Sequence, residues 1–234
     1  MAMRWHALPD AAAQVASLAD AIAATLTRVI EQQGSACLAV SGGRSPIALF
    51  AALRVLPLRW ADVSITLVDE RAVPPEHADS NARLVREHLL QDAAAAARFF
   101  PLVLSPHVHG DSVDVDACVA TANEPFQQPD VVILGMGDDG HTASLFPDAA
   151  ELGEGIDRTH APAYLPVRPG MAPHRRISLN LSALCTAQRL FLSITGPLKR
   201  GVFEQAAQGE AQRALPVSYI IHQREVPLDV YWTA

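Results

Sequence analysis

The chain has 234 residues, of which 50% are hydrophobic and 18% are charged, and its formal net charge is -7. This composition is typical of a globular protein with a sizeable core, and we expect a single domain over residues 1–234. The acidic charge argues against a nucleic-acid partner, and no apolar run approaches the roughly 18 residues that cross a bilayer. Three widely spaced cysteines and an N-terminus unlike a signal peptide favour a cytoplasmic location.

The N-terminal part predicts a helix followed by a buried strand. Apolar residues recur at spacings of three and four over residues 10–33, with Asp10 as the N-cap of this helix and Gly34 at its end. Residues 36–40 form a short apolar run that is typical of a buried strand. We expect the helix to belong to the scaffold, because its apolar stripe is continuous.

A glycine-rich loop follows this strand directly, and it consists of Ser41, Gly42, Gly43 and Arg44. Ser45 can cap the next helix, and Pro46 suits its first position. Free backbone N–H groups and the positive end of the helix dipole would face a ligand here, which makes the stretch a candidate anion site. An ordinary tight turn between a strand and a helix is the alternative.

Charged residues end the next predicted strand. Residues 63–68, which read VSITLV, predict a buried strand that leads into Asp69, Glu70 and Arg71. The guanidinium of Arg71 offers a planar fork to a carboxylate, an oxyanion or a phosphate. Three charges after a buried strand are also common where a chain simply enters solvent.

The middle of the chain gives weaker signals. The predicted elements are a helix capped by Asp79 or Ser80, helical residues 93–97, a short strand within 99–104 and a helix over 111–122. His107 and His109 form an HxH pair without a cysteine or a further histidine nearby. We interpret them as exposed loop residues rather than as metal ligands.

A second glycine-rich loop follows the apolar run at 131–134. It begins at Gly135, contains two carboxylates including Asp139, and leads to His141. A buried strand therefore delivers an acid and an imidazole to one spot. After this loop, residues 151–176 are rich in glycine and proline, and they predict an excursion over the site.

The C-terminal part predicts a strand-like run at 177–180, a strand at 189–194, a helix from 197 to about 209, and a short helix and a last strand within 216–232. Lys199 and Arg200 lie in the first turn of the helix at 197, where cations oppose the helix dipole. Lys199 is also the only lysine, beside 17 arginines. A bound anion would compensate both cations, although a tolerated surface pair explains them too.

Strands alternate with helices throughout, without a repeat or a linker. This order predicts an α/β fold, with a single doubly wound, mainly parallel sheet and helices on both faces. Ligands of such sheets bind just outside the carboxyl ends of the strands. The two glycine-rich loops, Arg71 and Lys199 all follow predicted strands, so we expect them to meet there.

The loop at 135–140 matches GxGxxG, so a dinucleotide site is the first alternative. Its two carboxylates would face the pyrophosphate, and this fingerprint normally opens the first βαβ unit, which disfavours that interpretation. A Ser-His-Asp triad is disfavoured because GxSxG is absent. Water activation by His141 remains, with Asp139 fixing the imidazole tautomer or orienting a water. A purely structural His–Asp pair fits the spacing equally well.

Four separated motifs resemble those of the 6-phosphogluconolactonase family. They read SGGRSP, DERAVPPEHADSN, GMGDDGHTASLFP, and PHRRIS followed by TGPLKR, in the order of the family and over most of the chain. The related glucosamine-6-phosphate deaminases also contain GxGxDGH. They place a glutamate where this chain has Phe146, and a tyrosine where it has Arg71. Both departures favour the lactonase.

The resemblance implies a modified Rossmann fold similar to that of the deaminases, and hydrolysis of 6-phospho-D-glucono-1,5-lactone in the oxidative pentose phosphate pathway. It implies that His141 is the general base, that Asp139 assists it, and that Arg71 stabilises developing charge. The expected substrate-binding residues are Ser41, Gly42, Gly43, Arg44, Asp69, Gly137, Arg176 and Lys199. We expect no cofactor, no metal, and a phosphorylated sugar lactone as the partner of a monomer or homodimer.

Two other functions stay open at this point. An amino-sugar-phosphate deaminase or isomerase would share the GxGxDGH loop. A non-catalytic phosphosugar sensor would keep the binding residues, but the chain has no basic DNA-binding segment and retains Asp139 and His141.

Overall fold

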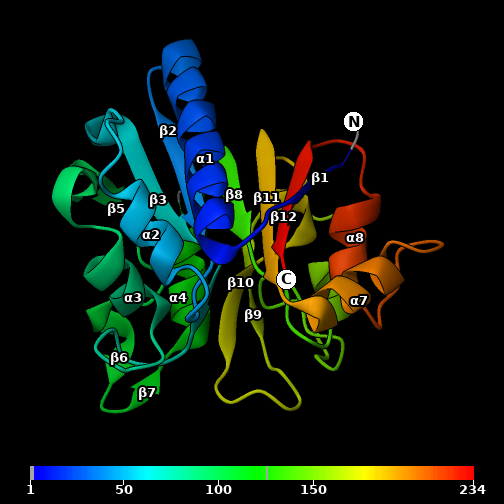
Figure 1. The fold of residues 1–234 in the computed structure, drawn as a ribbon. Helices are drawn as coiled ribbons and strands as arrows, with labels where there is room; N and C mark the ends of the chain where they lie inside the picture. The colour runs from blue at the N-terminus through cyan, green and yellow to red at the C-terminus, as the bar shows by residue number, and fades with distance from the viewer. Residues whose placement is uncertain (1–2, 125) are drawn as a thin grey trace.

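Seven parallel strands form the central sheet of the structure, a computed structural model that describes residues 3–124 and 126–234 (Figure 1). The strand order is β1-β12-β11-β8-β2-β3-β5. These strands are β1 (Arg4–Ala7), β2 (Ala36–Val40), β3 (Val63–Leu67), β5 (Arg98–Phe99), β8 (Val131–Leu134), β11 (Arg189–Thr195) and β12 (Leu228–Thr233). Every residue of β2, β3 and β8 is buried, which explains why their sequences are apolar apart from Ser64 and Thr66 of β3.

The chain winds outward from the middle of this sheet in two directions. It passes from β2 through β3 to β5 at one edge, and from β8 through β11 to β12 on the other side, where β1 completes the sheet. All neighbouring strands of this sheet are parallel. The predicted doubly wound sheet is therefore confirmed, and its switch point lies between β2 and β8.

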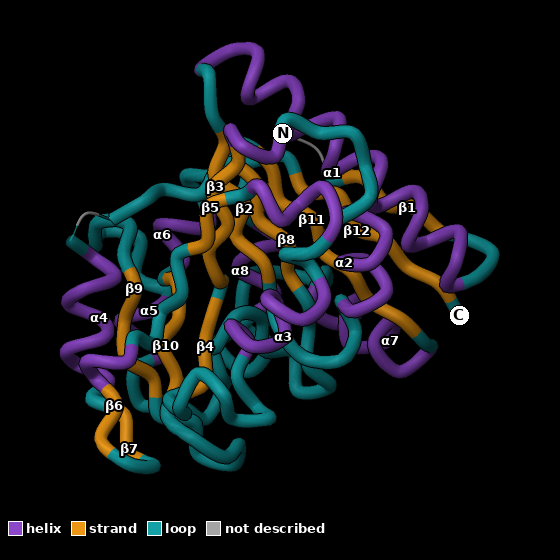
Figure 2. The backbone as a smooth tube through the Cα atoms, turned by 90° about the vertical axis from the view of Figure 1, so that its left-hand side faces the viewer, coloured by secondary structure: helices purple, strands orange, loops and turns teal. Residues whose placement is uncertain are grey.

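Helices cover both faces of the sheet. They are α1 (Ala11–Gln33), α2 (Ile47–Leu53), α3 (Asn81–His88), α4 (Val115–Asn123), α5 (Leu152–Gly155), α6 (Leu181–Leu184), α7 (Pro197–Ala206) and α8 (Val217–His222). α1 and α2 lie on one face, whereas α4 and α6 lie on the other (Figure 2). α1 is long and apolar enough to cross a membrane by length and composition, but its stripe of Leu18, Ile22 and Leu26 is buried in the core.

A second sheet, which is antiparallel, contains β4 (Asp69–Arg71), β10 (Arg176–Leu179) and β9 (Tyr164–Val167), with β10 in the middle. Only Val68 separates β3 from β4, so one segment passes from the first sheet into the second. The Leu179 N–H donates to the Val68 carbonyl (2.9 Å), and the Tyr164 hydroxyl donates to the Leu67 carbonyl (2.8 Å). These bonds hold the two sheets together. A hairpin of β6 (Val108–His109) and β7 (Ser112–Val113) is separate from both.

Two predicted helix starts are wrong for local reasons. Ser45 does not cap α2, because the helix begins at Ile47, after Pro46, and has no side-chain cap. The helix predicted over 111–122 begins at Val115, because the side chain of Asp114 caps it there by accepting the Ala117 N–H. By contrast, Asp10 and Gly34 bound α1 as predicted.

Other differences concern short elements. Residues 92–96 form a 3-10 turn instead of an α-helix, and the strand predicted within 99–104 is only the two-residue β5. The segment 151–176 is not a mere excursion, because it contains α5 and the largely buried strand β9. The half-buried strand β1 has no clear apolar pattern and was not predicted.

Candidate active site

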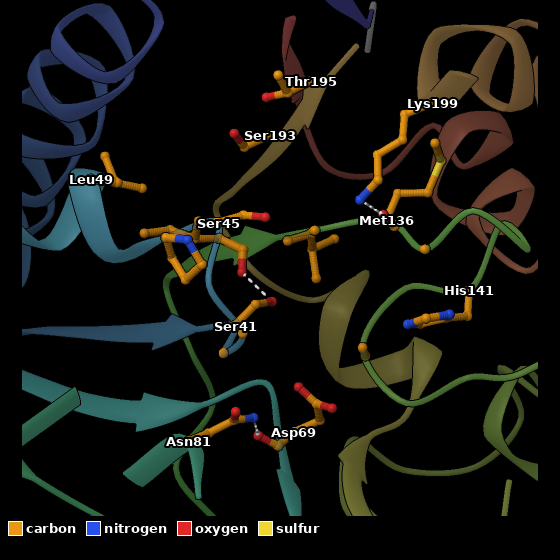
Figure 3. A pocket seen from close by; sticks show the side chains of 18 of the residues that line it. Ser41, Ser45, Leu49, Asp69, Asn81, Met136, His141, Ser193, Thr195 and Lys199 are labelled. Carbon is orange, nitrogen blue, oxygen red and sulfur yellow. Dashed lines mark hydrogen bonds between the residues drawn. The ribbon is translucent and has the colours of Figure 1, made fainter. Parts of the chain in front are cut away.

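A cavity of about 440 Å³ opens at the carboxyl ends of β2, β8 and β11, next to the switch point of the sheet. Figure 3 shows Ser41, Asp69, His141 and Lys199 around it. The predicted site residues that line it are Ser41, Gly42, Gly43, Asp69, Arg71, Gly137, His141 and Lys199. The structure thus brings together predicted residues from four segments that are far apart in the sequence.

His141 and Asp139 form a hydrogen-bonded pair at one side of the cavity. His141 Nδ1 lies 2.6 Å from Asp139 Oδ1, and the His141 backbone N–H donates to the same oxygen at 3.1 Å. The outer edge of the imidazole points into the cavity (Figure 3). Burial acts to raise the pKa of Asp139, but the hydrogen bond and charge of His141 outweigh it and hold that pKa below its usual value.

Only glycine fits at residue 137, because His141 and Asp139 lie directly against its backbone. A Cβ atom at residue 137 would lie 2.2 Å from His141 Nδ1 and 2.5 Å from Asp139 Oδ1. The Gly137 N–H also donates to the His141 carbonyl (2.9 Å), so the loop closes on itself. The backbone of Gly137 therefore forms the surface against which the imidazole rests.

The three residues after His141 lock the loop to its surroundings. The buried Thr142 hydroxyl donates to the Gly135 carbonyl (2.9 Å), at the end of β8. Ala143 adopts a left-handed backbone conformation with φ of 52°, which is unfavourable for a residue with a Cβ. Next, the buried Ser144 hydroxyl donates to Asp69 Oδ2 at 2.5 Å. This turn thus places His141 at the cavity and Ser144 against the side chain of Asp69.

Phe146 packs against the imidazole of His141. Its ring centre lies 4.3 Å from that of His141, and the side chain is buried. The guanidinium carbon of Arg176 lies 6.0 Å from the Phe146 ring centre. The position at which the resembling deaminases carry a glutamate therefore holds an apolar support for the imidazole.

Glu70 anchors strand β4 below the cavity. Its carboxylate is fully buried and accepts hydrogen bonds from the backbone N–H groups of Arg71 (2.7 Å), Asn81 (2.8 Å) and Ala82 (2.7 Å), and from the Ser80 hydroxyl (3.2 Å). Burial raises the pKa of Glu70 to about 7, against the lowering effect of the N–H groups. This carboxylate ties the start of α3 to β4, so it sets the backbone position of Asp69 and Arg71.

The first glycine-rich loop rests on Asn81. A Cβ atom at Gly42 would lie 1.7 Å from Asn81 Oδ1, so the loop can approach this side chain only as glycine. Asn81 Nδ2 donates to the Asp69 carbonyl (2.8 Å). On the other side, the Ser41 hydroxyl donates to the Ile133 carbonyl (2.8 Å) in β8. The loop is therefore packed between the start of α3 and β8.

The predicted cations differ in their relation to the cavity. Lys199 lines it and donates from Nζ to the Met136 carbonyl (2.6 Å), while Arg71 lines it and donates to the Asp79 carbonyl (2.6 Å). Arg44 is exposed and lies outside the lining. Arg176 is buried and also lies outside, because its guanidinium donates to the Pro173 (2.6 Å) and His174 (3.2 Å) carbonyls.

Several cavity residues were missed by the sequence analysis, among them Gln14, Asn81, Ser193 and Thr195. Gln14 is buried, and its Nε2 donates to the Ile194 (2.9 Å) and Tyr231 (2.8 Å) carbonyls at the ends of β11 and β12. A signal for it existed, because Gln14 is a polar residue in register with the apolar stripe of α1. Within residues 3–124 and 126–234, no group of three or more His, Cys, Asp or Glu side chains is arranged to hold a metal ion.

Known proteins resemble this chain over almost its whole length. The family model described as glucosamine-6-phosphate isomerases/6-phosphogluconolactonase matches residues 9–232. The 6-phosphogluconolactonase of Neisseria meningitidis is 45% identical, over 97% of this chain and 98% of that protein. The 6-phosphogluconolactonase of Pseudomonas putida is 41% identical, over 99% and 93% respectively.

Solved structures show the same likeness. A 6-phosphogluconolactonase from Shewanella baltica has a TM-score of 0.90 at 36% identity, and the match covers 100% of this chain and 98% of that one. A monomeric glucosamine-6-phosphate deaminase has a TM-score of 0.74 at 15% identity, with 97% of each chain covered. The second likeness concerns the fold alone.

Proposed function

The chain belongs to the glucosamine-6-phosphate isomerase/6-phosphogluconolactonase family, and we propose that it hydrolyses 6-phospho-D-glucono-1,5-lactone to 6-phosphogluconate. Its relatives from Neisseria and Pseudomonas carry the corresponding name at 45% and 41% identity. The observation that carries the proposal is the His141–Asp139 pair at 2.6 Å, which faces a cavity that also contains Arg71 and Lys199. A base and two cations around one cavity suit an anionic ester substrate.

In the proposed reaction, His141 removes a proton from the water that attacks the lactone carbonyl. Asp139 Oδ1 accepts a hydrogen bond from the Nδ1–H of His141, which leaves Nε2 unprotonated and able to act as the base. The resulting tetrahedral intermediate collapses by breaking the bond between the carbonyl carbon and the ring oxygen. The imidazolium returns its proton to that oxygen, which becomes the C5 hydroxyl of the acid product.

Arg71 is proposed to stabilise the negative charge that develops on the carbonyl oxygen. Its guanidinium lines the cavity, and the Asp79 carbonyl at 2.6 Å restrains it. A preorganised donor at an oxyanion contributes about 3–4 kcal/mol to lowering the activation barrier. Arg71 stands where the resembling deaminases have a tyrosine, so this charge is a feature of the lactonase pattern.

The 6-phosphate is proposed to bind between Lys199 and the loop from Ser41 to Arg44, at the backbone N–H groups of Gly42, Gly43 and Arg44, because the Ser41 N–H donates to the Ile133 carbonyl (3.2 Å). The phosphate does not react, but its binding energy fixes the lactone carbonyl next to His141. The resemblance also implies that Arg44 and Arg176 bind the substrate. Each of them would have to reorient to do so, because Arg44 is exposed and Arg176 donates to backbone carbonyls.

Phe146 supports the lactonase over a deaminase. A buried phenyl ring 4.3 Å from the imidazole centre offers no proton, whereas a glutamate at this position would. We also propose that the enzyme works in the cytoplasm, as a monomer or homodimer, in the oxidative pentose phosphate pathway. These three points follow from the resemblance and from the metabolic role of the substrate.

The test is a coupled assay that follows the decay of freshly generated phosphogluconolactone, with the uncatalysed decay in buffer subtracted. We expect the wild type to accelerate decay, and His141→Ala to reduce kcat by about 10²–10⁴-fold. His107→Ala, in the β6 region, is the matched control and should keep full turnover. Near-normal turnover of His141→Ala would overturn the assignment of the base, and release of ammonia from an amino-sugar phosphate would favour the deaminase.

A further inference from the structure

Ser144 and Asp69 are joined across the two parts of the cavity wall. Ser144 belongs to the loop that carries His141, and Asp69 is the first residue of β4. The Ser144 hydroxyl donates to Asp69 Oδ2 at 2.5 Å, and Ser144 itself has no exposed surface. Its backbone N–H donates to Ser178 Oγ (3.1 Å), and residue 178 pairs with Asp69 in the second sheet.

The hydrogen bond from Ser144 fixes only the side chain of Asp69, because other contacts hold the Asp69 backbone. β4 pairs with β10 at this residue, and Asn81 Nδ2 donates to the Asp69 carbonyl at 2.8 Å. Removing the Ser144 hydroxyl therefore leaves the strand in place and releases only the carboxylate. The strained φ of 52° at Ala143 is what turns Ser144 toward Asp69 directly after His141.

The orientation of Asp69 has a chemical consequence. One of its carboxylate oxygens is used by Ser144, and the carboxylate points into the cavity, with Ser41 on one side of it and His141 on the other (Figure 3). An ionised carboxylate accepts hydrogen bonds and donates none. The donors that a sugar lactone offers are its hydroxyl groups, whereas its carbonyl oxygen would be repelled.

We propose that Ser144 is a positioning residue that aims Asp69 at the lactone hydroxyl next to the scissile carbonyl, and that this pair selects substrates carrying that hydroxyl. The inference rests on the proposed function, because it takes the carbonyl to lie at His141. Asp69 and His141 both line the cavity, and the Asp69 side chain lies between those of Ser41 and His141 in Figure 3. With the carbonyl at His141, the hydroxyl assigned to Asp69 in this proposal is the one on the neighbouring ring carbon. Ser144 and Asp69 would then determine substrate specificity through a hydroxyl group of the lactone, separately from the residues that bind the phosphate and activate the water.

The experiment compares two substrates, 6-phosphogluconolactone and its 2-deoxy analogue, and measures kcat/KM for each. The wild type should prefer the parent lactone, and Ser144→Ala should lose about tenfold of this preference, because a hydroxyl bond to a charged acceptor is lost. The turnover of the 2-deoxy analogue should change much less. Asp69→Ala should lose the preference as well, and it provides the test if Ser144→Ala fails to fold.

Thr142→Val is the matched control. It removes another fully buried hydroxyl from the same loop, two residues from Ser144, but this hydroxyl bonds the Gly135 carbonyl and not Asp69. We expect this variant to keep the wild-type preference between the two lactones. Loss of the preference in Thr142→Val would assign the effect to general loosening of the loop and overturn the inference.

Failure of the inference differs from failure of the proposed function. If the wild type hydrolyses the parent lactone but Ser144→Ala and Asp69→Ala discriminate as well as the wild type, the role of Ser144 and Asp69 is refuted and the function stands. If the wild type does not accelerate lactone decay beyond the buffer rate, the proposed function itself is refuted.

Discussion

Gly137→Ala is expected to abolish most of the activity without adding or removing any functional group. The new Cβ would lie 2.2 Å from His141 Nδ1 and 2.3 Å from Cε1, whereas ordinary contact begins at 3.4 Å. The imidazole must therefore move by about 1.2 Å, and Asp139 Oδ1, at 2.5 Å from the Cβ, must move with it or lose its bond. A misplacement of about 1 Å lowers turnover by about 10²-fold, which corresponds to about 2.7 kcal/mol of activation free energy.

The fold should tolerate this change, because the His141 side chain is 29% exposed and can swing outward instead of disrupting the loop. We therefore expect kcat to fall while thermal unfolding, followed by circular dichroism, stays close to that of the wild type. Gly201→Ala in α7 is the matched control, since a Cβ there would meet no atom within 4 Å and residue 201 lies outside the cavity lining. If kcat of Gly137→Ala stays within about threefold of the wild type, or falls equally in Gly201→Ala, the proposed geometry of the base is wrong.

Three further predictions concern other parts of the site. Asp139→Asn should lower kcat by about 10²-fold or more with little change in KM, because an amide can hold the wrong imidazole tautomer; steady-state kinetics would show it. Lys199→Ala should raise KM for the phosphorylated lactone by about tenfold and leave hydrolysis of unphosphorylated gluconolactone unchanged; an equal loss on both would exclude a phosphate contact. The pKa of Glu70 is raised from 4.5 to about 7, so the native state keeps a proton that the unfolded state has lost, and the free energy of unfolding should fall as pH rises through this window. Urea unfolding should show a weaker pH dependence in Glu70→Gln, which is also less stable by about 1–3 kcal/mol because the Ala82 N–H loses its acceptor.

The central sheet could be predicted because its strands are buried on both faces. β2, β3 and β8 consist of apolar or small residues throughout, and helix α1 carries both of its caps in the sequence. The second sheet could not be predicted in the same way. The residues of β4 read Asp-Glu-Arg, and the buried Glu70 is satisfied by three donors from the start of α3 and by the N–H of Arg71 in β4 itself. No local sequence pattern predicts that these donors will satisfy the buried Glu70.

In the candidate site as well, local contacts could be predicted from the sequence and contacts between distant segments could not. The pair of Asp139 and His141 was predictable, since its members are two residues apart on one loop. The bond between Ser144 and Asp69 spans 75 residues and depends on the pairing of β4 with β10, so it is visible only in three dimensions. The contact of Gly42 with Asn81 is hidden for the same reason, although both residues lie in motifs that the family resemblance identified.

Because the sequence contains a single lysine, the cavity can be labelled selectively with amine-reactive reagents. Lys199 carries the only ε-amino group in the chain, and it lies in the first turn of α7, inside the cavity. A reagent that acylates or reductively alkylates amines therefore has one side-chain target. Because the α-amino terminus reacts too, the extent of labelling at Lys199 is read from the mass of the peptide that contains it. Occupancy of the cavity by any anionic ligand becomes measurable as protection of that group, even for compounds that the enzyme does not turn over. A protease specific for lysine likewise has one bond to cut, directly after this residue, so its cleavage rate would report how often α7 opens.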